Sequence, residues 1–160
     1  MSQDQEKRFL KLIDENVGII FKVIRIYSNS MADEKDLKQE ILYQAWQSFP
    51  RYKGDSKFST WLYKVALNTA LTHVKKETRN KENQSGIVEE YTEVGNESKE
   101  LLIKLIRNFK DIEKLVIMLH LDGYSNEEIS NISGLKLNHV AVMIYRIKEK
   151  LAEKLKNKKV

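Results

Sequence analysis

The sequence predicts an all-α protein made of two small helical domains, the C-terminal one a helix-turn-helix, joined by a flexible linker. Apolar residues recur at steps of three and four over most of the chain, which is the period of an amphipathic helix. Only one proline and six glycines interrupt the 160 residues. Periodicity stops over residues 81–98, where acidic side chains outnumber basic ones. We therefore expect domains at residues 1–80 and 99–160.

Composition narrows the class of protein. A hydrophobic content of 41% is enough for packed cores, and a net charge of +5 favours a polyanionic partner. The absence of cysteine excludes disulfides and thiolate metal sites. No apolar run approaches the length of about 18 residues expected of a membrane span, and the segment MSQDQEKRF lacks the features of a signal peptide. We expect no membrane insertion and a cytoplasmic location.

Three helices are predicted in the first domain. The apolar pattern places them at Gln5–Tyr27, at Asp33–Ser48 and from Phe58 to about residue 79. Pro50 ends the second helix because proline lacks an amide hydrogen. Gly54 and the two residues after it form the next turn. Short connections between three helices predict a small bundle.

The second of these helices has an apolar stripe beside a polar one. Its apolar stripe consists of Leu37, Ile41 and Ala45, and its polar stripe of Asp36, Gln39, Glu40 and Tyr43. The nearby acids Asp33, Glu34, Asp36 and Glu40 could be read as a metal or acid–base site. We disfavour that interpretation because no His or Cys stands nearby at ligand spacing. A solvated helix face is the plainer alternative.

Basic residues surround an aromatic residue in the connection to the third helix. Arg51, Lys53 and Lys57 flank Tyr52 in a glycine-containing loop, where an aromatic ring suits stacking on an unpaired base. The aromatic residues Trp46, Phe49, Phe58 and Trp61 are expected to contribute at least partly to the core. A basic ridge on the third helix comprises Lys64, Asn68, Thr72, Lys75 and Arg79. An acidic helix beside a basic aromatic unit suggests two partners, one positively charged and one a nucleic acid.

The second domain ends in a helix-turn-helix pattern. Apolar faces over residues 101–109 and 112–119 predict two helices, and Gly123 ends the second of them. Ser125 and Glu128 form a capping box that opens a short helix, which residues 133–134 terminate. A longer helix follows to about Lys156, with a buried stripe of Val140, Ile144, Ile147, Leu151 and Leu155. Short helix, glycine turn and longer helix are typical of DNA-binding domains.

Two long stretches resemble one family in the family's own order. The pattern DxxDLxQE, then W, then FxRYKGDSxFSTWLYxVAxN resembles the N-terminal domain of bacterial RNA polymerase sigma factors of the extracytoplasmic-function (ECF) type. The stretch GYSNEEISNISGLKLNHVAVMIYRIKEKL resembles their C-terminal domain. The resemblance implies promoter-specific transcription initiation, with core RNA polymerase (its β′ clamp and β flap) and promoter DNA as partners. An inhibitory anti-sigma factor is a further partner that it allows. It implies no enzymatic activity, no cofactor and no metal in this chain.

The resemblance also assigns surfaces to the first domain. The polymerase clamp would contact Asp36, Gln39 and Glu40, with Leu37 and Ile41 as apolar support. The loop from Arg51 to Phe58 would hold a flipped base of the minus-ten element, and Asn68 matches a position that reads promoter bases. The set expected to contact the minus-ten element is Arg51, Tyr52, Lys53, Ser56, Lys57, Trp61, Lys64, Asn68 and Lys75.

The last helix would read the minus-thirty-five element. We expect Asn138, His139, Val142, Met143, Arg146 and Lys150 to contact DNA. Val142 or Met143 could touch a thymine methyl group, while Arg146 and Lys150 bind phosphate or guanine. The alternative is that Val142 and Met143 simply pack on a partner. Relatives often have Ser at the helix start, where this chain has Lys136, so the capping role is left to Asn138 as the candidate.

Two other functional classes stay open at this point. The chain could be a stand-alone helix-turn-helix regulator with an N-terminal dimerisation or effector domain, or an adaptor that binds only protein. Its histidines, His73, His120 and His139, are far apart and share no spacing, which disfavours a catalytic or metal site. No Walker loop, dinucleotide fingerprint or nucleophile elbow is present.

Overall fold

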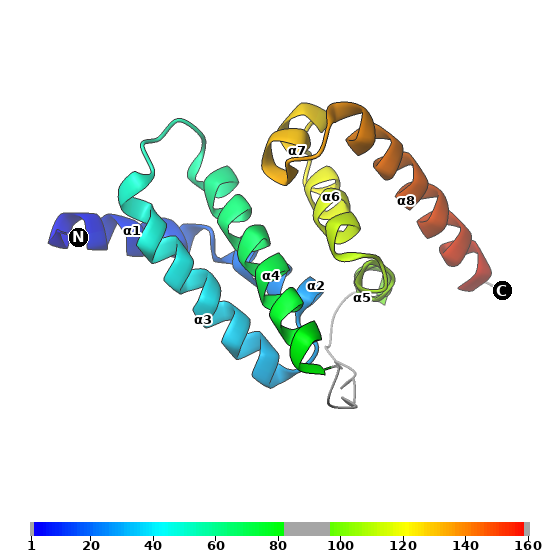
Figure 1. The fold of residues 1–160 in the computed structure, drawn as a ribbon, viewed down its shortest axis with the longest axis horizontal. Helices are drawn as coiled ribbons and strands as arrows, with labels where there is room; N and C mark the ends of the chain where they lie inside the picture. The colour runs from blue at the N-terminus through cyan, green and yellow to red at the C-terminus, as the bar shows by residue number, and fades with distance from the viewer. Residues whose placement is uncertain (1, 82–96, 159–160) are drawn as a thin grey trace. The chain divides into compact units, whose positions relative to one another are not determined.

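The computed structural model describes residues 2–81 and 97–158, and its helices confirm the all-α prediction (Figure 1). The chain divides into two compact units, Met1–Thr92 and Glu93–Val160. No β-strand occurs in either described stretch. Most of the predicted linker, residues 82–96, lies outside the described residues. At its edges Lys81 ends one helix and Glu97 begins the next, and the domain limits themselves stay a prediction.

The first unit contains α1 (Gln3–Glu15), α2 (Val17–Tyr27), α3 (Met31–Ser48), the 3-10 turn η1 (Phe49–Arg51) and α4 (Phe58–Lys81). The second contains α5 (Glu97–Arg107), α6 (Asp111–Leu121), α7 (Asn126–Ser133) and α8 (Leu137–Lys158). None of these described helices is long and apolar enough to cross a bilayer.

The prediction of one continuous helix over Gln5–Tyr27 is wrong, because the helix is interrupted at Asn16. The backbone of Asn16 leaves the helical region, with φ −123° and ψ 16°. Its side-chain amide donates a hydrogen bond of 2.8 Å to the carbonyl of Leu12. Asn side chains compete with the backbone for such acceptors, and this competition disfavours helix interiors. The chain therefore forms two helices, α1 and α2.

The core of the first unit lies between α2, α3 and α4, which pack against one another. The apolar stripe of α3 faces this core, since Leu37, Ile41 and Ala45 all have 0% exposure. Ile20 and Val23 of α2 are buried in it, and so are Leu62, Tyr63 and Leu67 of α4. α3 begins at Met31, where the Ser30 hydroxyl caps it by accepting a hydrogen bond from the Asp33 amide. These contacts present the polar stripe of α3 to solvent.

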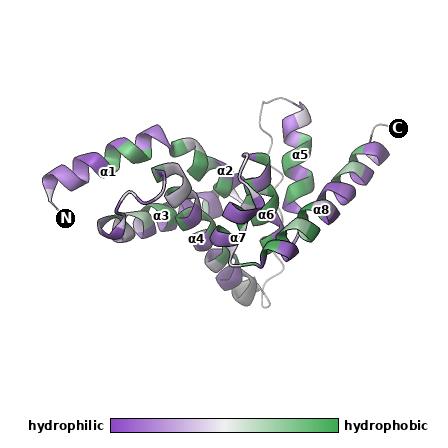
Figure 2. Cartoon of the chain, turned by 90° about the horizontal axis from the view of Figure 1, so that it is seen from above, coloured by the Kyte–Doolittle hydropathy of each residue, from purple (hydrophilic) through white to green (hydrophobic). Residues whose placement is uncertain are grey.

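The second unit has the predicted helix-turn-helix. The Ser125–Glu128 capping box is present, with both reciprocal hydrogen bonds at 3.1 Å. Gly134 ends α7 at φ 79°, a conformation that non-glycine residues rarely adopt. α6, α7 and α8 pack together over residues such as Leu115, Ile129 and Ile147, none of which is exposed above 1%. Figure 2 shows green apolar and purple polar residues sharing α8, as expected of a helix with one buried face.

Candidate docking and nucleic-acid interfaces

The polar stripe of α3 is accessible along its length. Asp36, Gln39, Glu40 and Tyr43 are exposed, and Tyr43 reaches 59% exposure. Leu37 and Ile41, on the adjacent stripe, are fully buried. These two side chains therefore hold α3 on the bundle from below and do not themselves touch a partner. This burial restricts direct contacts on α3 to the exposed polar residues.

Tyr52 belongs to an aromatic cluster, so its ring packs within the first unit in addition to lying in the basic loop. Its ring centroid lies 5.2 Å from Trp61 and 5.8 Å from Phe58, and it stacks on Phe49 at 6.2 Å. The phenol hydroxyl donates a hydrogen bond of 2.6 Å to the carbonyl of Ser56. The ring thus fixes both ends of the loop, and its half-exposed remainder is what a base could meet.

The aromatic cluster comprises Phe9, Trp46, Phe49, Tyr52, Phe58 and Trp61. Phe9, Phe49 and Phe58 are buried, whereas Trp46, Tyr52 and Trp61 are half-buried. It joins α1, α3, η1 and α4, and so anchors the loop that connects α3 to α4. The cations of this loop, Arg51, Lys53 and Lys57, are all exposed. A packed aromatic cluster surrounded by exposed cationic side chains suits a polyanion with unstacked bases.

A polar groove between α3 and α4 connects two surfaces that the sequence analysis treated separately. Its lining residues are Glu40 and Gln44 of α3 with Asn68, Thr69, Thr72, His73 and Lys76 of α4. Glu40 belongs to the predicted docking face, and Asn68 to the predicted base-reading ridge. Both are exposed, as are Lys64 and Lys75 of the same ridge. Gln44, Thr69 and Lys76 were missed because only the packing of α3 on α4 brings them to this groove.

The exposed face of α8 contains five of the six residues predicted to contact DNA, and it also contains Tyr145. Asn138, Val142, Tyr145 and Glu149 share one stripe, and Val142 and Tyr145 are 46% and 64% exposed. His139 and Arg146 are exposed beside it, whereas Met143 is half-buried. A hydrogen bond from Tyr145 to Glu149, with the charge of that carboxylate, raises the pKa of the Tyr145 hydroxyl. Tyr145 was not among the predicted residues, although its spacing from Asn138 and Val142 could have revealed it.

Lys150 lies at the edge of this face, next to α6 and the end of α5. Its ammonium is 3.8 Å from a carboxylate oxygen of Glu113 and 5.9 Å from the ring centroid of Phe109. The side chain is still 55% exposed.

The expected cap at Asn138 is wrong, because α8 begins at Leu137 and places Asn138 inside its first turn. Nearby, burial lowers the pKa of His120, and the charge of Lys148 adds to that effect.

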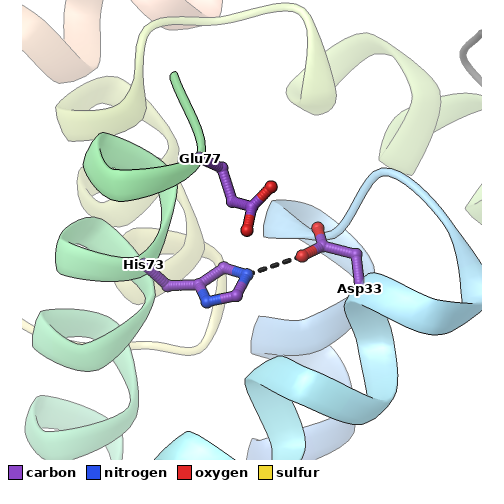
Figure 3. A group of neighbouring side chains, drawn as sticks. All are labelled: Asp33, His73 and Glu77. Atoms are coloured by element: carbon purple, nitrogen blue, oxygen red, sulfur yellow. Dashed lines mark hydrogen bonds and ion pairs between the residues drawn. The ribbon is translucent and has the colours of Figure 1, made fainter. Parts of the chain in front are cut away.

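Three side chains converge where the first turn of α3 meets the second half of α4, namely those of Asp33, His73 and Glu77 (Figure 3). His73 Nε2 and Asp33 Oδ1 are 2.6 Å apart, although 40 positions separate the two residues. The expectation that no histidine accompanies the acids of α3 is therefore wrong for Asp33. The sequence could have indicated two of the three residues, because His73 and Glu77 are four positions apart and so share one helix face.

Comparison with known proteins finds similar sequences and structures that extend over both units. Residues 12–80 match the sigma-70 region 2 family. The chain is 25% identical to the ECF RNA polymerase sigma-E factor of Haemophilus influenzae over an alignment 173 positions long, covering 97% of this chain and 91% of that protein. It is 26% identical to the ECF RNA polymerase sigma-E factor of Escherichia coli K12, covering 77% of this chain and 74% of that one.

Two solved structures share the fold. The sigma factor RpoE from Bartonella quintana, solved in complex with the anti-sigma factor NepR, superposes with a TM-score of 0.74 at 19% identity, over 97% of this chain and 98% of that one. CnrH, solved in complex with the cytosolic domain of CnrY, superposes with a TM-score of 0.67 at 18% identity, over 95% and 90%. These likenesses extend over both helical units.

Proposed function

We propose that the chain is an RNA polymerase sigma factor of the ECF type and that it performs promoter-specific initiation with the surfaces described above. In this mechanism it binds core RNA polymerase, reads two promoter elements and melts the upstream edge of the minus-ten element. Sigma factors as a family are not enzymes, and we assign RNA synthesis to the polymerase. The chain would act in the cytoplasm, where it meets polymerase and promoter DNA.

Docking on the polymerase is assigned to the polar stripe of α3. Asp36, Gln39 and Glu40 are exposed together on a helix whose opposite stripe is fully buried. Such a helix presents its carboxylates in a fixed orientation, and charge complementarity across an interface steers and orients association. The partner surface is the positively charged face of the β′ clamp, and the second unit contacts the β flap. Leu37 and Ile41 support this surface from the core.

The loop between α3 and α4 is assigned to the minus-ten element. Tyr52 and Trp61 present half-buried rings at the surface of the aromatic cluster. Stacking of a nucleobase on such a ring contributes about 1–3 kcal/mol. Arg51, Lys53 and Lys57 are exposed around them for phosphate contacts, and Ser56 is exposed at the turn. On α4, Lys64 and Lys75 contact phosphates of the DNA backbone, while Asn68 reads a base from the polar groove.

The exposed face of α8 is assigned to the minus-thirty-five element. In helix-turn-helix domains the second helix enters the major groove with its N-terminal residues at the base edges. Asn138, His139 and Val142 lie in that part of α8, and all three are exposed. Met143 contacts DNA with the part of its side chain that packing leaves accessible. Arg146 and Lys150 lie further along and contact phosphates.

An anti-sigma factor is a further partner in this proposal. Both structural neighbours were solved in complexes, RpoE with the anti-sigma factor NepR and CnrH with the cytosolic domain of CnrY. A partner that occupies the polar stripe of α3 or the exposed face of α8 would block polymerase or promoter. Such a partner would act by competition and needs no chemistry in this chain.

The observation that carries the proposal is the match of residues 12–80 to sigma-70 region 2, followed by a helix-turn-helix unit. Run-off transcription with purified core polymerase and a library of promoter fragments tests it. We expect transcripts only when the chain is added, from promoters that share two spaced elements. Tight binding to duplex DNA without any initiation would instead indicate a stand-alone regulator. Binding to neither polymerase nor DNA would indicate a protein-only adaptor.

A further inference from the structure

We propose that Asp33, His73 and Glu77 form a binding site for one divalent metal ion with zinc-like ligand preference. The site lies between the first turn of α3 and the second half of α4 (Figure 3). Each residue offers one ligand atom, and these atoms all lie within 4.8 Å of one another. The inference concerns metal binding alone and does not depend on the function proposed above.

The three side chains approach from two helices and meet in a partly enclosed place. The side chains of His73 and Asp33 are only 10% and 13% exposed. His73 and Glu77 are separated by four residues, so one face of α4 presents both. Figure 3 shows the Glu77 carboxylate directed toward the space between the His73 ring and Asp33. A metal ion placed there would meet ligands from both helices.

Asp33 is already oriented by hydrogen bonds that leave one carboxylate oxygen for the site. Its Oδ2 accepts a hydrogen bond of 3.0 Å from the Asn29 amide, while Oδ1 faces His73. Its own amide donates to the Ser30 hydroxyl at 3.1 Å. Partners of this kind fix ligand orientation in metal sites and are part of the binding design. The Asp33 ligand therefore needs little reorganisation.

The ligand chemistry favours a zinc-like ion over magnesium or calcium. One imidazole and two carboxylates suit Zn²⁺ and similar first-row ions, whereas Mg²⁺ and Ca²⁺ prefer oxygen ligands alone. Zn–N and Zn–O bonds of about 2.0–2.2 Å place neighbouring ligand atoms about 3.3 Å apart in a tetrahedral site. His73 Nε2 and Asp33 Oδ1, now 2.6 Å apart, would separate by less than about 1 Å. The fourth position would be left to water.

Two carboxylates held this close repel each other, and a bound cation removes that repulsion. The ion would also bridge α3 to α4, in addition to the apolar contacts between them. Ligands that bind only the folded state raise the unfolding temperature by mass action. For a unit of this size we expect a rise of about 10 °C when free metal exceeds the dissociation constant about a hundredfold.

The test uses the full chain after treatment with a chelator. Zn²⁺ is titrated by calorimetry, and Co²⁺ by visible absorption, because cobalt in a tetrahedral site has strong d–d bands. We expect one equivalent to bind, Mg²⁺ in large excess not to displace it, and the melting midpoint of the first unit to rise. Glu77→Gln and His73→Gln should weaken binding at least tenfold. Glu34→Gln, which removes the same charge from α3 outside the cluster, should bind as the wild type does.

Glu77→Gln decides the matter if His73→Gln fails to fold, because it leaves the Asp33–His73 hydrogen bond in place. Unchanged Zn²⁺ affinity in a folded Glu77→Gln protein would overturn the proposal, and so would the absence of a one-equivalent site in the wild type. Run-off transcription with the metal-free and the Zn²⁺-loaded chain, at the same Mg²⁺ concentration, keeps the two questions separate. Metal binding that fails while promoter-specific transcription persists rejects only the metal site.

Discussion

The loop between α3 and α4 and the exposed face of α8 are both assigned to promoter DNA, yet they are built differently. In the loop, Tyr52 and Trp61 pack at 5.2 Å in an aromatic cluster that also holds the chain together. On α8, Val142 and Tyr145 are 46% and 64% exposed, while a separate stripe faces the core. Packing and the proposed recognition therefore share side chains in the first region and use different ones in the second.

This difference has a mechanical reason. A flipped base needs a rigid concave surface, and rigidity around a loop requires the recognition side chains themselves to pack. A recognition helix obtains rigidity from its backbone hydrogen bonds and buried stripe, which leaves the other stripe free to vary. Substitutions in the loop should change stability and melting together, whereas those on α8 should change promoter choice alone. The following predictions test that contrast, starting with the largest effect.

Leu37→Ala should cause the largest loss of stability. Leu37 is fully buried under the docking face of α3, and removing such a side chain costs about 2–5 kcal/mol through lost burial and a residual cavity. We expect a large drop in the free energy of unfolding, measured by urea denaturation of the first unit. Gln39→Ala, on the exposed stripe of the same helix, is the control and should change it by less than about 0.5 kcal/mol. Equal losses would mean that α3 is not held by its buried stripe.

Tyr52→Ala should reduce promoter melting by about tenfold or more. The substitution removes a ring that can stack on a base, worth about 1–3 kcal/mol, and also three ring contacts in the aromatic cluster. Permanganate reactivity of promoter thymines measures the melting, and thermal unfolding of the free chain measures the packing.

Tyr52→Phe is the matched variant for this prediction. It keeps the ring and loses only the hydrogen bond to the Ser56 carbonyl, which contributes about 1 kcal/mol. We expect near wild-type melting at a slightly lower unfolding temperature. A Tyr52→Ala protein with wild-type permanganate reactivity would separate packing from recognition in the loop and break the contrast with α8.

Local patterns predicted much of this fold. The burial of Leu37, Ile41 and Ala45 follows from helical period alone, and the turn at Gly134 follows from the conformational freedom of glycine. The break at Asn16 was missed because a side-chain hydrogen bond to Leu12, rather than the apolar pattern, determines it. Such local competition leaves the period of the apolar residues nearly unchanged.

Contacts between distant segments were beyond prediction. The Tyr52 cluster joins four elements, and the Asp33–His73 pair spans 40 positions, so neither has a local signature. The groove that connects Glu40 to Asn68 exists only because α3 packs on α4. Tyr145 on α8 had a local signal, since it follows Asn138 and Val142 at helical spacing.

Val142→Arg should redirect minus-thirty-five preference more than Met143→Arg. Val142 is 46% exposed near the start of α8, whereas Met143 is half-buried at the edge of the core-facing stripe. A new arginine contact with guanine is worth about 1–3 kcal/mol of discrimination. Transcription from a promoter library measures both variants. A larger change for Met143→Arg would place Met143, and not Val142, at the base edges.

Asp36→Lys combined with Glu40→Lys should weaken binding to core polymerase without unfolding the chain. Both residues are exposed on one face, so reversing them turns attraction into repulsion at that surface. We expect a loss of roughly 1 kcal/mol or more per charge that faces the clamp, measured as polymerase affinity at two salt concentrations. The double variant Asp14→Lys/Glu15→Lys, at the exposed end of α1, controls for net charge. Equal loss in that control would show that total charge, and not the α3 face, governs docking.

Lys150→Ala should have the smallest effect, and it tests whether recognition and packing are fully separate on α8. The Lys150 ammonium lies 3.8 Å from a carboxylate oxygen of Glu113 and 5.9 Å from the Phe109 ring centroid. Its charge therefore already interacts with groups of the second unit. A pair at 3.8 Å whose cation is 55% exposed contributes less than about 1 kcal/mol, which sets the expected loss of stability. A phosphate contact by the same ammonium would lower transcription from all promoters alike and reduce the salt slope of DNA binding by about one. We expect a slope change below that for Lys150→Ala and close to it for Arg146→Ala, because Arg146 lies nearer the centre of the exposed face. Salt titrations of promoter binding by polymerase carrying each variant decide the order. A full unit of slope for Lys150→Ala would mean that the ion pair with Glu113 opens on DNA, and that α8 also shares side chains between packing and recognition.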